Sequence, residues 1–128
     1  MTNKIAVSTK MAPKAIGPYS QGIAVDSFLF VSGQLPIDPD TGKFIDGNIA
    51  ARAHQVFNNL KSIIHAAGGT MADVVKITLF LTDMNDFKAV NEIYSKHFVD
   101  PYPARSAVQV TALPLGSNIE AEAIVCIG

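Results

Sequence analysis

The longest regular pattern of apolar side chains lies in the middle of the chain, between two turn-forming stretches. Apolar residues recur there at helical spacing and form one stripe, which consists of Ile49, Ala53, Val56, Phe57, Leu60, Ile63, Ile64 and Ala67. Asn48 stands at the position of an N-cap, and Gly68-Gly69 follows the last apolar residue. The pattern therefore predicts an amphipathic helix between Asn48 and Gly68.

A second, shorter helix is predicted from about Asp86 to Phe98. Four side chains recur at helical spacing on one of its faces: Phe87, Val90, Tyr94 and Phe98. Asp83 or Asn85 is its expected cap, because both residue types accept hydrogen bonds from the free N–H groups of a first helical turn. Two prolines just beyond the helix predict a loop.

Shorter apolar runs predict the strands of a sheet. They span residues 5–8, 21–25, 28–32, 73–82, 105–111 and 118–127. Asp26-Ser27 is expected to join the second and third runs as a hairpin, and residues 34–47 are rich in turn formers. The order of strands, helix, strand, helix and two strands predicts an α+β fold with both helices on one face of the sheet.

The side chains of the predicted strands divide between two faces. In the strand at residues 73–82, one face is expected to carry Val75, Ile77, Leu79 and Leu81, and the other Val74, Lys76, Thr78, Phe80 and Thr82. The face without helices is expected to carry Phe80, Ala107, Ile124 and Cys126, mixed with Lys76, Gln109 and Glu122. A lone monomer seldom leaves such an apolar patch exposed, so we expect a closed homo-oligomer that buries it.

Composition indicates a small soluble domain and argues against nucleic acid as its main partner. The 128 residues are expected to form one domain, residues 1–128, and only 16% of them are charged. That low share indicates a generous core or a surface buried against another chain. The formal net charge is −1 and no run of basic residues occurs, which argues against a dedicated nucleic-acid binder.

The sequence lacks the motifs that bind common cofactors and the segments that direct a chain to the membrane or for secretion. Cys126 is the single cysteine, so neither an internal disulfide nor a thiolate zinc site is available. His54, His65 and His97 lack metal-ligand spacing, and the glycine-rich nucleotide motifs are absent. We expect no nucleotide, flavin or metal cofactor. With no signal peptide and no apolar stretch near the roughly 20 residues of a membrane span, a cytoplasmic location is expected, and an organelle is left open.

Each of the last two predicted strands carries a charged residue that could bind a ligand or take part in catalysis. If these strands pair as a hairpin through residues 113–117, the side chains of Arg105 and Glu120 lie on the same side. A guanidinium matches a carboxylate ligand with two parallel hydrogen bonds, and a nearby carboxylate can accept a proton from water. From these two residues alone, a structural Arg–Glu salt bridge at a subunit seam is the simpler interpretation.

Two further positions near strand ends are candidate ligand contacts. Tyr19 precedes a strand and its phenol could orient a ligand, although tyrosines are also common in cores. Ser32 ends an apolar strand, and Gly33 after it would let a ligand approach the backbone. An ordinary turn at Ser32-Gly33 stays open as the alternative.

Several segments occur together in an order that identifies a family. They are Ala15–Gln21, Val31–Pro36, Pro103–Ser106 and Ile119–Ile124, with Asn85–Phe87 and Val90-Asn91 between them. Essentially from end to end, the chain resembles the YjgF/RidA family, the reactive intermediate deaminases. The resemblance implies a chorismate-mutase-like fold assembled as a homotrimer, with clefts between subunits.

The resemblance also implies an activity and roles for the candidate residues. The activity is that of a 2-iminobutanoate/2-iminopropanoate deaminase, which hydrolyses enamines and imines such as 2-aminoacrylate to 2-oxo acids and ammonia without a cofactor. Pyridoxal-phosphate-dependent dehydratases release these substrates. By position, Arg105 would bind the substrate carboxylate and Glu120 would position or activate water. The remaining matches would line the cleft or support it: Tyr19, Ser32, Gly33 and Asn91.

One departure and two alternatives accompany this interpretation. Ala107 stands where bacterial members often have cysteine, so a thiol role is lost there while a backbone role is kept. The first alternative is a non-catalytic module that binds 2-oxo acids or a protein partner. The second is an RNA-cleaving translation inhibitor, which the near-neutral charge and the lack of an expected histidine pair disfavour.

Overall fold

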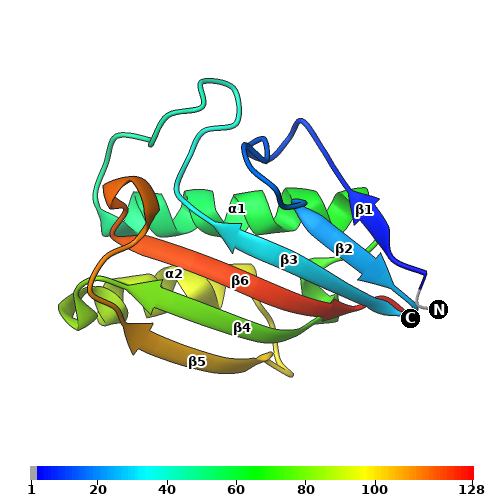
Figure 1. The fold of residues 1–128 in the computed structure, drawn as a ribbon. Coiled ribbons are helices and arrows are strands. Elements are labelled where there is room, and N and C mark those ends of the chain that lie inside the picture. The colour runs from blue at the N-terminus through cyan, green and yellow to red at the C-terminus, as the bar shows by residue number, and fades with distance from the viewer. Residues whose placement is uncertain (1–2) are drawn as a thin grey trace.

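A computed structural model describes residues 3–128 as one mixed six-stranded sheet with two helices (Figure 1). The strands are β1 (Ile5–Val7), β2 (Gly22–Val25), β3 (Phe28–Gln34), β4 (Val74–Leu81), β5 (Ala104–Gln109) and β6 (Ile119–Cys126). The helices are α1 (Ile49–Ala66) and α2 (Phe87–His97), with 3₁₀ turns η1 (Met71–Asp73), η2 (Met84–Asp86) and η3 (Pro114–Gly116). The α+β class and every predicted helix and strand are confirmed.

The ends of α1 follow from its local sequence. The side chain of Asn48 accepts a hydrogen bond from the backbone N–H of Ala51 at 3.0 Å, as expected of an N-cap. Beyond the helix, Gly68 takes a φ of +90°, a conformation that side chains with a Cβ rarely adopt. The predicted start and end of this helix are therefore confirmed.

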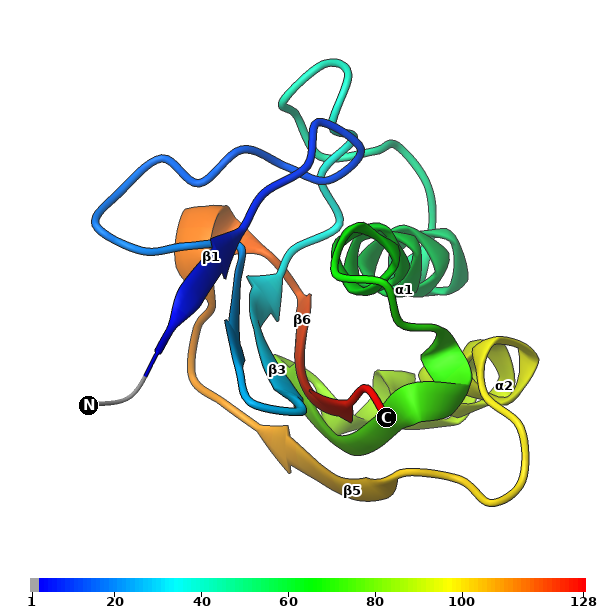
Figure 2. The same ribbon diagram turned by 90° about the vertical axis from the view of Figure 1, so that its right-hand side faces the viewer.

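Both helices pack on the same face of the curved sheet, as expected (Figure 2). The apolar stripe of α1 meets the inward side chains of the central strands, and these side chains are buried: Leu29, Val31, Ile77, Leu79, Leu81, Ile119, Ala121, Ala123 and Val125. This burial is the main stabilising contribution to the fold. Among residues 3–128, neither helix has the length and apolar character needed to cross a membrane.

The predicted β5–β6 hairpin is wrong. The strand order is β1-β2-β3-β6-β4-β5, so β6 lies between β3 and β4 and is antiparallel to both. β5 pairs with β4 in parallel, because α2 carries the chain back across the sheet before β5 begins. The segment after β5 then passes the end of β4, visible in orange in Figure 1, to enter the centre of the sheet.

The predicted faces of β4 are wrong at its start. A β-bulge lies between Val74 and Lys76, where β4 shifts its register against β6. The extra residue reverses the expected alternation, so Val74 is buried and Val75 is 44% exposed. Beyond the bulge, Ile77, Leu79 and Leu81 point into the core as predicted.

The helix-free face is apolar, but its membership differs from the expectation. Ala107 and Gln109 pair with Leu79 and Leu81, so they share the helix-covered face rather than the open one. Other exposed apolar side chains take their place, with Phe28 at 44%, Phe30 at 45% and Val108 at 41% exposure. The expected apolar patch on the open face is therefore present: Phe80, Ile124 and Cys126 belong to it as predicted, and Phe28, Phe30 and Val108 join them in place of Ala107.

A histidine pair links the two helices, contrary to the expectation that none would form. Nδ1 of His54 on α1 and Nε2 of His97 on α2 are 2.8 Å apart, so the protonated nitrogen of one ring donates a hydrogen bond to the bare nitrogen of the other. Burial, the neighbouring His54 and the Lys61 ammonium lower the pKa of His97 to about 4. The pair lies 43 residues apart in sequence, and only the packing of α1 on α2 brings it together.

This pair makes the fold sensitive to acid. Because the pKa of His97 is about 4 in the folded chain against 6.5 for the free side chain, the unfolded state binds a proton first as the pH falls. We predict that titration of His97 does not change the free energy of unfolding above pH 6.5, and that this free energy falls progressively as the pH is lowered from about 6.5 to 4. Urea unfolding of the wild type and of His97→Gln across that range measures it. Parallel pH profiles for the two proteins would contradict the prediction.

Candidate functional site

A cavity of about 610 Å³ opens beside Glu120, and four of the predicted site residues line it. These are Tyr19, Ser32, Gly33 and Glu120. Glu120 projects from the open face of β6, and Ser32 and Gly33 lie near the end of β3. The structure therefore gathers these residues from three separate segments of the chain into one place.

The loop wall of this cavity is fixed by Gln21, which is buried. Its Nε2 donates to the backbone carbonyl groups of Thr9, Ala12 and Pro13, at 3.1, 3.3 and 2.7 Å. Its Oε1 accepts from the N–H of Thr9 at 2.7 Å. The loop that carries the cavity-lining Pro13 is thereby fixed to the start of β2.

Ser32 and Gly33 reach the cavity because the β3–β6 ladder is irregular there. Between Val31 and Gln34 the register shifts, so the intervening residues are not paired with β6 in the regular way. The Ser32 hydroxyl donates to the carbonyl of Ser20 at 2.5 Å, which fixes its orientation and leaves its oxygen as an acceptor. The ordinary turn considered as an alternative is not what forms here, because β3 continues through Ser32 to Gln34.

Gly33 is the residue that gives Glu120 its place. A Cβ added to Gly33 would lie 2.7 Å from Oε2 of Glu120 and 2.9 Å from its carboxyl carbon, closer than real Cβ contacts. The carboxylate therefore lies directly against the backbone of β3. No positive φ requires glycine at this position, so the close approach alone explains it.

The environment of Glu120 favours its protonated form. Burial raises the pKa of Glu120 above its ordinary value, and the negative charge of Glu122 on the same strand face raises it further. A carboxylate with a raised pKa accepts a proton more readily than an ordinary one. Glu120 is thus suited to take a proton from water in the cavity.

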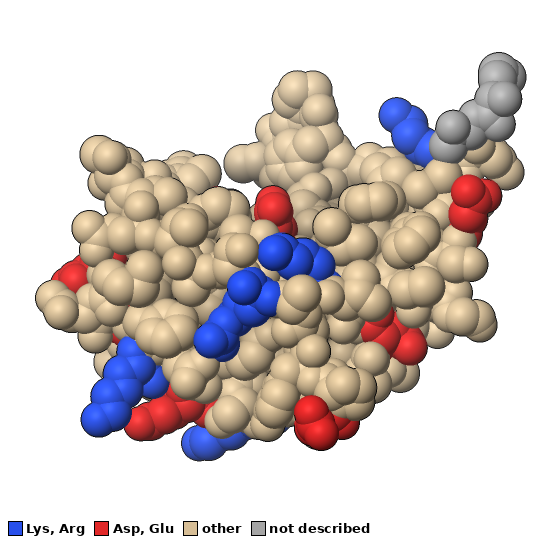
Figure 3. Space-filling view, turned by 90° about the horizontal axis from the view of Figure 1, so that it is seen from below, with Lys and Arg blue, Asp and Glu red and all other residues tan. Residues whose placement is uncertain are grey.

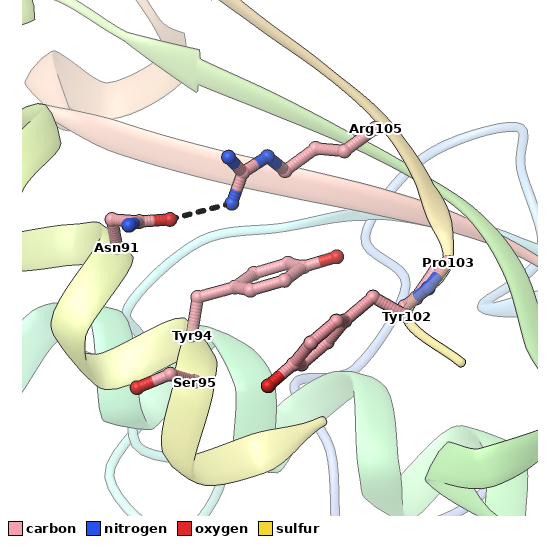
Figure 4. A pocket seen from close by; sticks show the side chains of 6 residues that line it. All are labelled: Asn91, Tyr94, Ser95, Tyr102, Pro103 and Arg105. Carbon is pink, nitrogen blue, oxygen red and sulfur yellow. Dashed lines mark hydrogen bonds between the residues drawn. The ribbon is translucent and has the colours of Figure 1, made fainter. Parts of the chain in front are cut away.

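Arg105 lies in a second cavity, of about 470 Å³, between β5 and α2 (Figure 4). Its Nη1 donates to Oδ1 of Asn91 at 2.7 Å. The guanidinium carbon lies 4.7 Å from the ring centre of Tyr94 and 5.2 Å from that of Phe87. Among residues 3–128, no acidic side chain lies within hydrogen-bonding distance of this cation, whose recorded partner is a neutral amide.

Arg105 and Glu120 lie on opposite faces of the sheet, so the expectation that one chain brings them together is wrong. Arg105 pairs with Ile77, whose side chain is buried under the helices. Glu120 pairs with Phe80, which lies on the open face. The strand β4 separates them, because β6 and β5 flank it on its two sides. Each chain therefore presents two separate halves of a site.

Three residues with roles in these cavities are absent from the sequence prediction of the site. Tyr94 and Tyr102 line the cavity of Arg105, and Gln21 fixes the wall of the other. The sequence placed Tyr94 only on the apolar face of α2. Its contact with Arg105 depends on the parallel pairing of β4 with β5, which no local pattern indicates.

The described residues offer little for a metal ion. Across residues 3–128, no three side chains among histidine, cysteine, aspartate and glutamate come together in a group able to hold one. The histidine pair supplies two ring nitrogens that already bond to each other. The side chains that can bind or transfer a proton at the two cavities include the guanidinium of Arg105, the carboxylates of Glu120 and Glu122, the ammonium group of Lys14 and several hydroxyl groups.

Comparisons with known proteins extend over nearly the whole chain. The sequence model of the family described as endoribonuclease L-PSP matches residues 9–127. A Homo sapiens protein named 2-iminobutanoate/2-iminopropanoate deaminase is 48% identical over 122 residues, which cover 95% of this chain and 89% of the human one.

Two solved structures are similar as well. RidA from the Antarctic bacterium Psychrobacter sp. PAMC 21119 has a TM-score of 0.93 at 46% identity, covering 96% of this chain and 99% of that one. TdcF of E. coli with bound serine has a TM-score of 0.91 at 40% identity, covering 97% and 99%.

The contact between Gly33 and Glu120 yields a structural prediction. We expect Gly33→Ala to fold with nearly unchanged thermal stability, because the flexible carboxylate can move away from the new methyl group. A crystal structure of the variant should show the Glu120 carboxylate turned from its wild-type position.

Gly17→Ala is the matched control, since a Cβ there would meet only the Tyr19 ring at an ordinary 3.5 Å. It should leave Glu120 in place. An unmoved Glu120 carboxylate in Gly33→Ala would show that the backbone approach does not hold it.

Proposed function

The chain belongs to the endoribonuclease L-PSP family, the YjgF/RidA family that its motifs resemble, and from this premise we propose that it is an enamine/imine deaminase. Its substrates would be 2-iminobutanoate, 2-iminopropanoate and the enamine 2-aminoacrylate, and its products 2-oxo acids and ammonia. The observation that carries the proposal is Arg105, a positioned cation in a cavity where no acidic side chain of residues 3–128 lies in hydrogen-bond reach. The name of the human relative supports the same activity.

We propose that the working unit is a homotrimer of chorismate-mutase-like subunits with clefts between neighbours. Each chain holds the two halves of the site on opposite faces of its sheet, so one chain alone cannot close them on one small substrate. A neighbouring copy could bring its Arg105 to the Glu120 cavity of the first. The exposed Phe28, Phe30 and Val108 on the open face give such an interface an apolar core.

In the proposed reaction, Arg105 binds the substrate carboxylate and orients the imine carbon. The Glu120 carboxylate takes a proton from a water molecule, whose oxygen adds to that carbon. The same proton then passes to the imine nitrogen, which gives a carbinolamine with one hydroxyl and one amino group. The hydroxyl proton is next transferred to that nitrogen through the Glu120 carboxylate, so the carbon–nitrogen bond breaks, ammonia leaves and the carbonyl of the 2-oxo acid forms. Tyr19, Ser32 and the backbone of Gly33 shape the cavity in which water and imine meet. Imines are already electrophilic, so orientation and one placed water suffice, and no cofactor takes part.

A turnover assay tests the activity. A serine dehydratase generates 2-aminoacrylate in place, and the protein should accelerate the release of pyruvate. Arg105→Ala should lower kcat/KM by roughly 30-fold or more, since losing the charged partner of a buried carboxylate costs at least about 2 kcal/mol. Glu120→Gln should lower kcat with a smaller effect on KM, because it removes the proton acceptor and keeps the shape.

Two control variants each remove a charge of the same sign as Arg105→Ala or Glu120→Gln, but outside the two cavities. Lys88→Ala and Glu92→Gln change exposed charges on α2 and should retain wild-type turnover. No acceleration by the wild type, or full activity of Arg105→Ala, would refute the deaminase. Saturable binding of 2-oxobutyrate without turnover would instead favour the non-catalytic 2-oxo acid module.

Mixing two inactive variants tests whether the site spans two copies. Arg105→Ala and Glu120→Gln chains refolded together should regain activity, because some clefts then combine the intact half of each. With random assembly of equal amounts, about a quarter of the clefts are complete. A mixture of Arg105→Ala with the double variant has no complete cleft and should stay inactive. Equal activity in the two mixtures would rule out a shared site.

The family description favours RNA cleavage as a second candidate function. Seen from below the sheet, a short row of basic side chains is flanked by acidic ones, so this face offers no extended basic surface to a phosphate backbone (Figure 3). His54 and His97 do form a pair, but neither lines the cavity of Arg105 or that of Glu120. RNA cleavage that survives Arg105→Ala and Glu120→Gln would point to a different site.

A further inference from the structure

The guanidinium of Arg105 rests against a set of side chains from α2 and its first turn. Asn91 accepts a hydrogen bond from Nη1, and the rings of Tyr94 and Phe87 lie within 4.7 and 5.2 Å of the guanidinium carbon. We call Phe87, Asn91 and Tyr94 the arginine seat. An exposed arginine without such contacts samples many rotamers, and fixing it on binding costs conformational entropy. The seat holds Arg105 before any ligand arrives.

The arginine seat leaves donors free for an anion. A guanidinium has five N–H groups in one plane, and the bond to Asn91 uses one of them, on Nη1. The aromatic rings contact the π-system of the cation rather than its N–H edge. The edge formed by Nε and Nη2 therefore stays available to a carboxylate, in an orientation that the seat defines (Figure 4).

Tyr94 is the part of the seat that is anchored in the core. Its side chain is only 5% exposed, and its ring packs against Phe98 at 4.4 Å and Phe57 at 5.7 Å between centres. A ring enclosed in this way cannot turn without disturbing the packing between α1 and α2. Packing in the core therefore fixes the orientation of the Tyr94 ring, and with it the ring face that Arg105 contacts.

The hydroxyl of Tyr94 does not explain why the residue lies there. It is buried and has no hydrogen-bond partner among residues 3–128. Burial raises the pKa of Tyr94, more than the Arg105 cation lowers it, so the phenol stays neutral and supplies no charge. Asn91, rather than Tyr94, accepts the hydrogen bond from Arg105. The ring face is what contacts the cation.

We infer that Tyr94 is a positioning residue for carboxylate binding, which acts through its aromatic ring by holding the Arg105 guanidinium in the orientation that receives the ligand. The inference rests on the proposed function for the identity of the ligand, a 2-imino or 2-oxo acid. It adds a residue beyond those that touch the substrate. It also predicts that ring and hydroxyl can be separated by mutation.

Binding of 2-oxobutyrate, measured by calorimetry, tests the inference. Tyr94→Phe keeps the ring and should bind within about twofold of the wild type, with unchanged or higher stability because an unpartnered buried hydroxyl is removed. Tyr94→Leu should bind roughly tenfold more weakly, about the contribution of one cation–aromatic contact and the orientation it gives. In turnover, the loss should appear mainly in KM. Tyr94→Met is a second non-aromatic variant in case Leu does not fold.

Ile64→Ala is the control for a merely structural role. Ile64 is fully buried on α1 against Gly69, and its removal leaves the rings around Tyr94 in place, so the variant should lower stability while leaving the affinity for 2-oxobutyrate unchanged. Equal weakening of binding by Ile64→Ala and Tyr94→Leu would overturn the inference. So would wild-type affinity in Tyr94→Leu, or a tenfold loss in Tyr94→Phe, which would assign the role to the hydroxyl.

A ligand-free measurement separates this inference from the proposed function. The order parameter of the Arg105 Nε–H bond, from ¹⁵N relaxation, should be high in the wild type and Tyr94→Phe and low in Tyr94→Leu. Arg52 is the only other arginine, so assignment is simple, and its signal serves as an internal control. A mobile Arg105 in the wild type would refute the seat even if imine hydrolysis is found. An ordered one would support it even if hydrolysis is absent.

Discussion

The pairing of β6 with both β3 and β4 is the constraint on which the rest of the molecule depends. Because β6 lies between β3 and β4, its inward side chains form the middle of the core, and its outward side chains lie on the helix-free face, where most of them are half-buried. Glu120 is one of those outward residues. The same arrangement moves β5 to the edge, where Arg105 faces α2. One choice of strand order therefore fixes both the core and the separation of the two charged groups.

Each half of the site draws its geometry from a different kind of support. Glu120 depends on backbone, since the irregular end of β3 and the missing side chain of Gly33 define where its carboxylate lies. Arg105 depends on side chains, since Asn91 and the aromatic cluster of α2 define the plane of its guanidinium. Neither support is local in sequence. Both are rigid because they are continuous with the packed interior.

Local patterns are sufficient to predict the helices and strands, and insufficient to predict how the strands are ordered in the sheet. The stripe of α1 and its Asn48 cap depend on neighbours a few residues away, and these predictions are confirmed. The order of strands depends on contacts between distant segments, so the short connection between β5 and β6 predicts a hairpin that the sheet does not contain. The bulge at Val74 and the pairing of Ala107 with Leu79 have the same non-local origin. The motifs single out Arg105 and Glu120, each of which lines a cavity, whereas the opposite faces on which they lie are visible only in the structure.

The contact between Gly33 and Glu120 also determines how this protein could be redesigned. One wall of the larger cavity is strand backbone, and any side chain added at position 33 would collide with the acid. Loop residues also line this cavity, among them Ile16, which is 80% exposed, and Leu115, which is 70% exposed. Substrate range could therefore be altered by exchanging those two side chains, whereas a side chain added to the strand wall at position 33 would displace the Glu120 carboxylate. One part of the cavity is thus constrained by the position of the Glu120 carboxylate, and the other part can change its side chains without displacing that carboxylate.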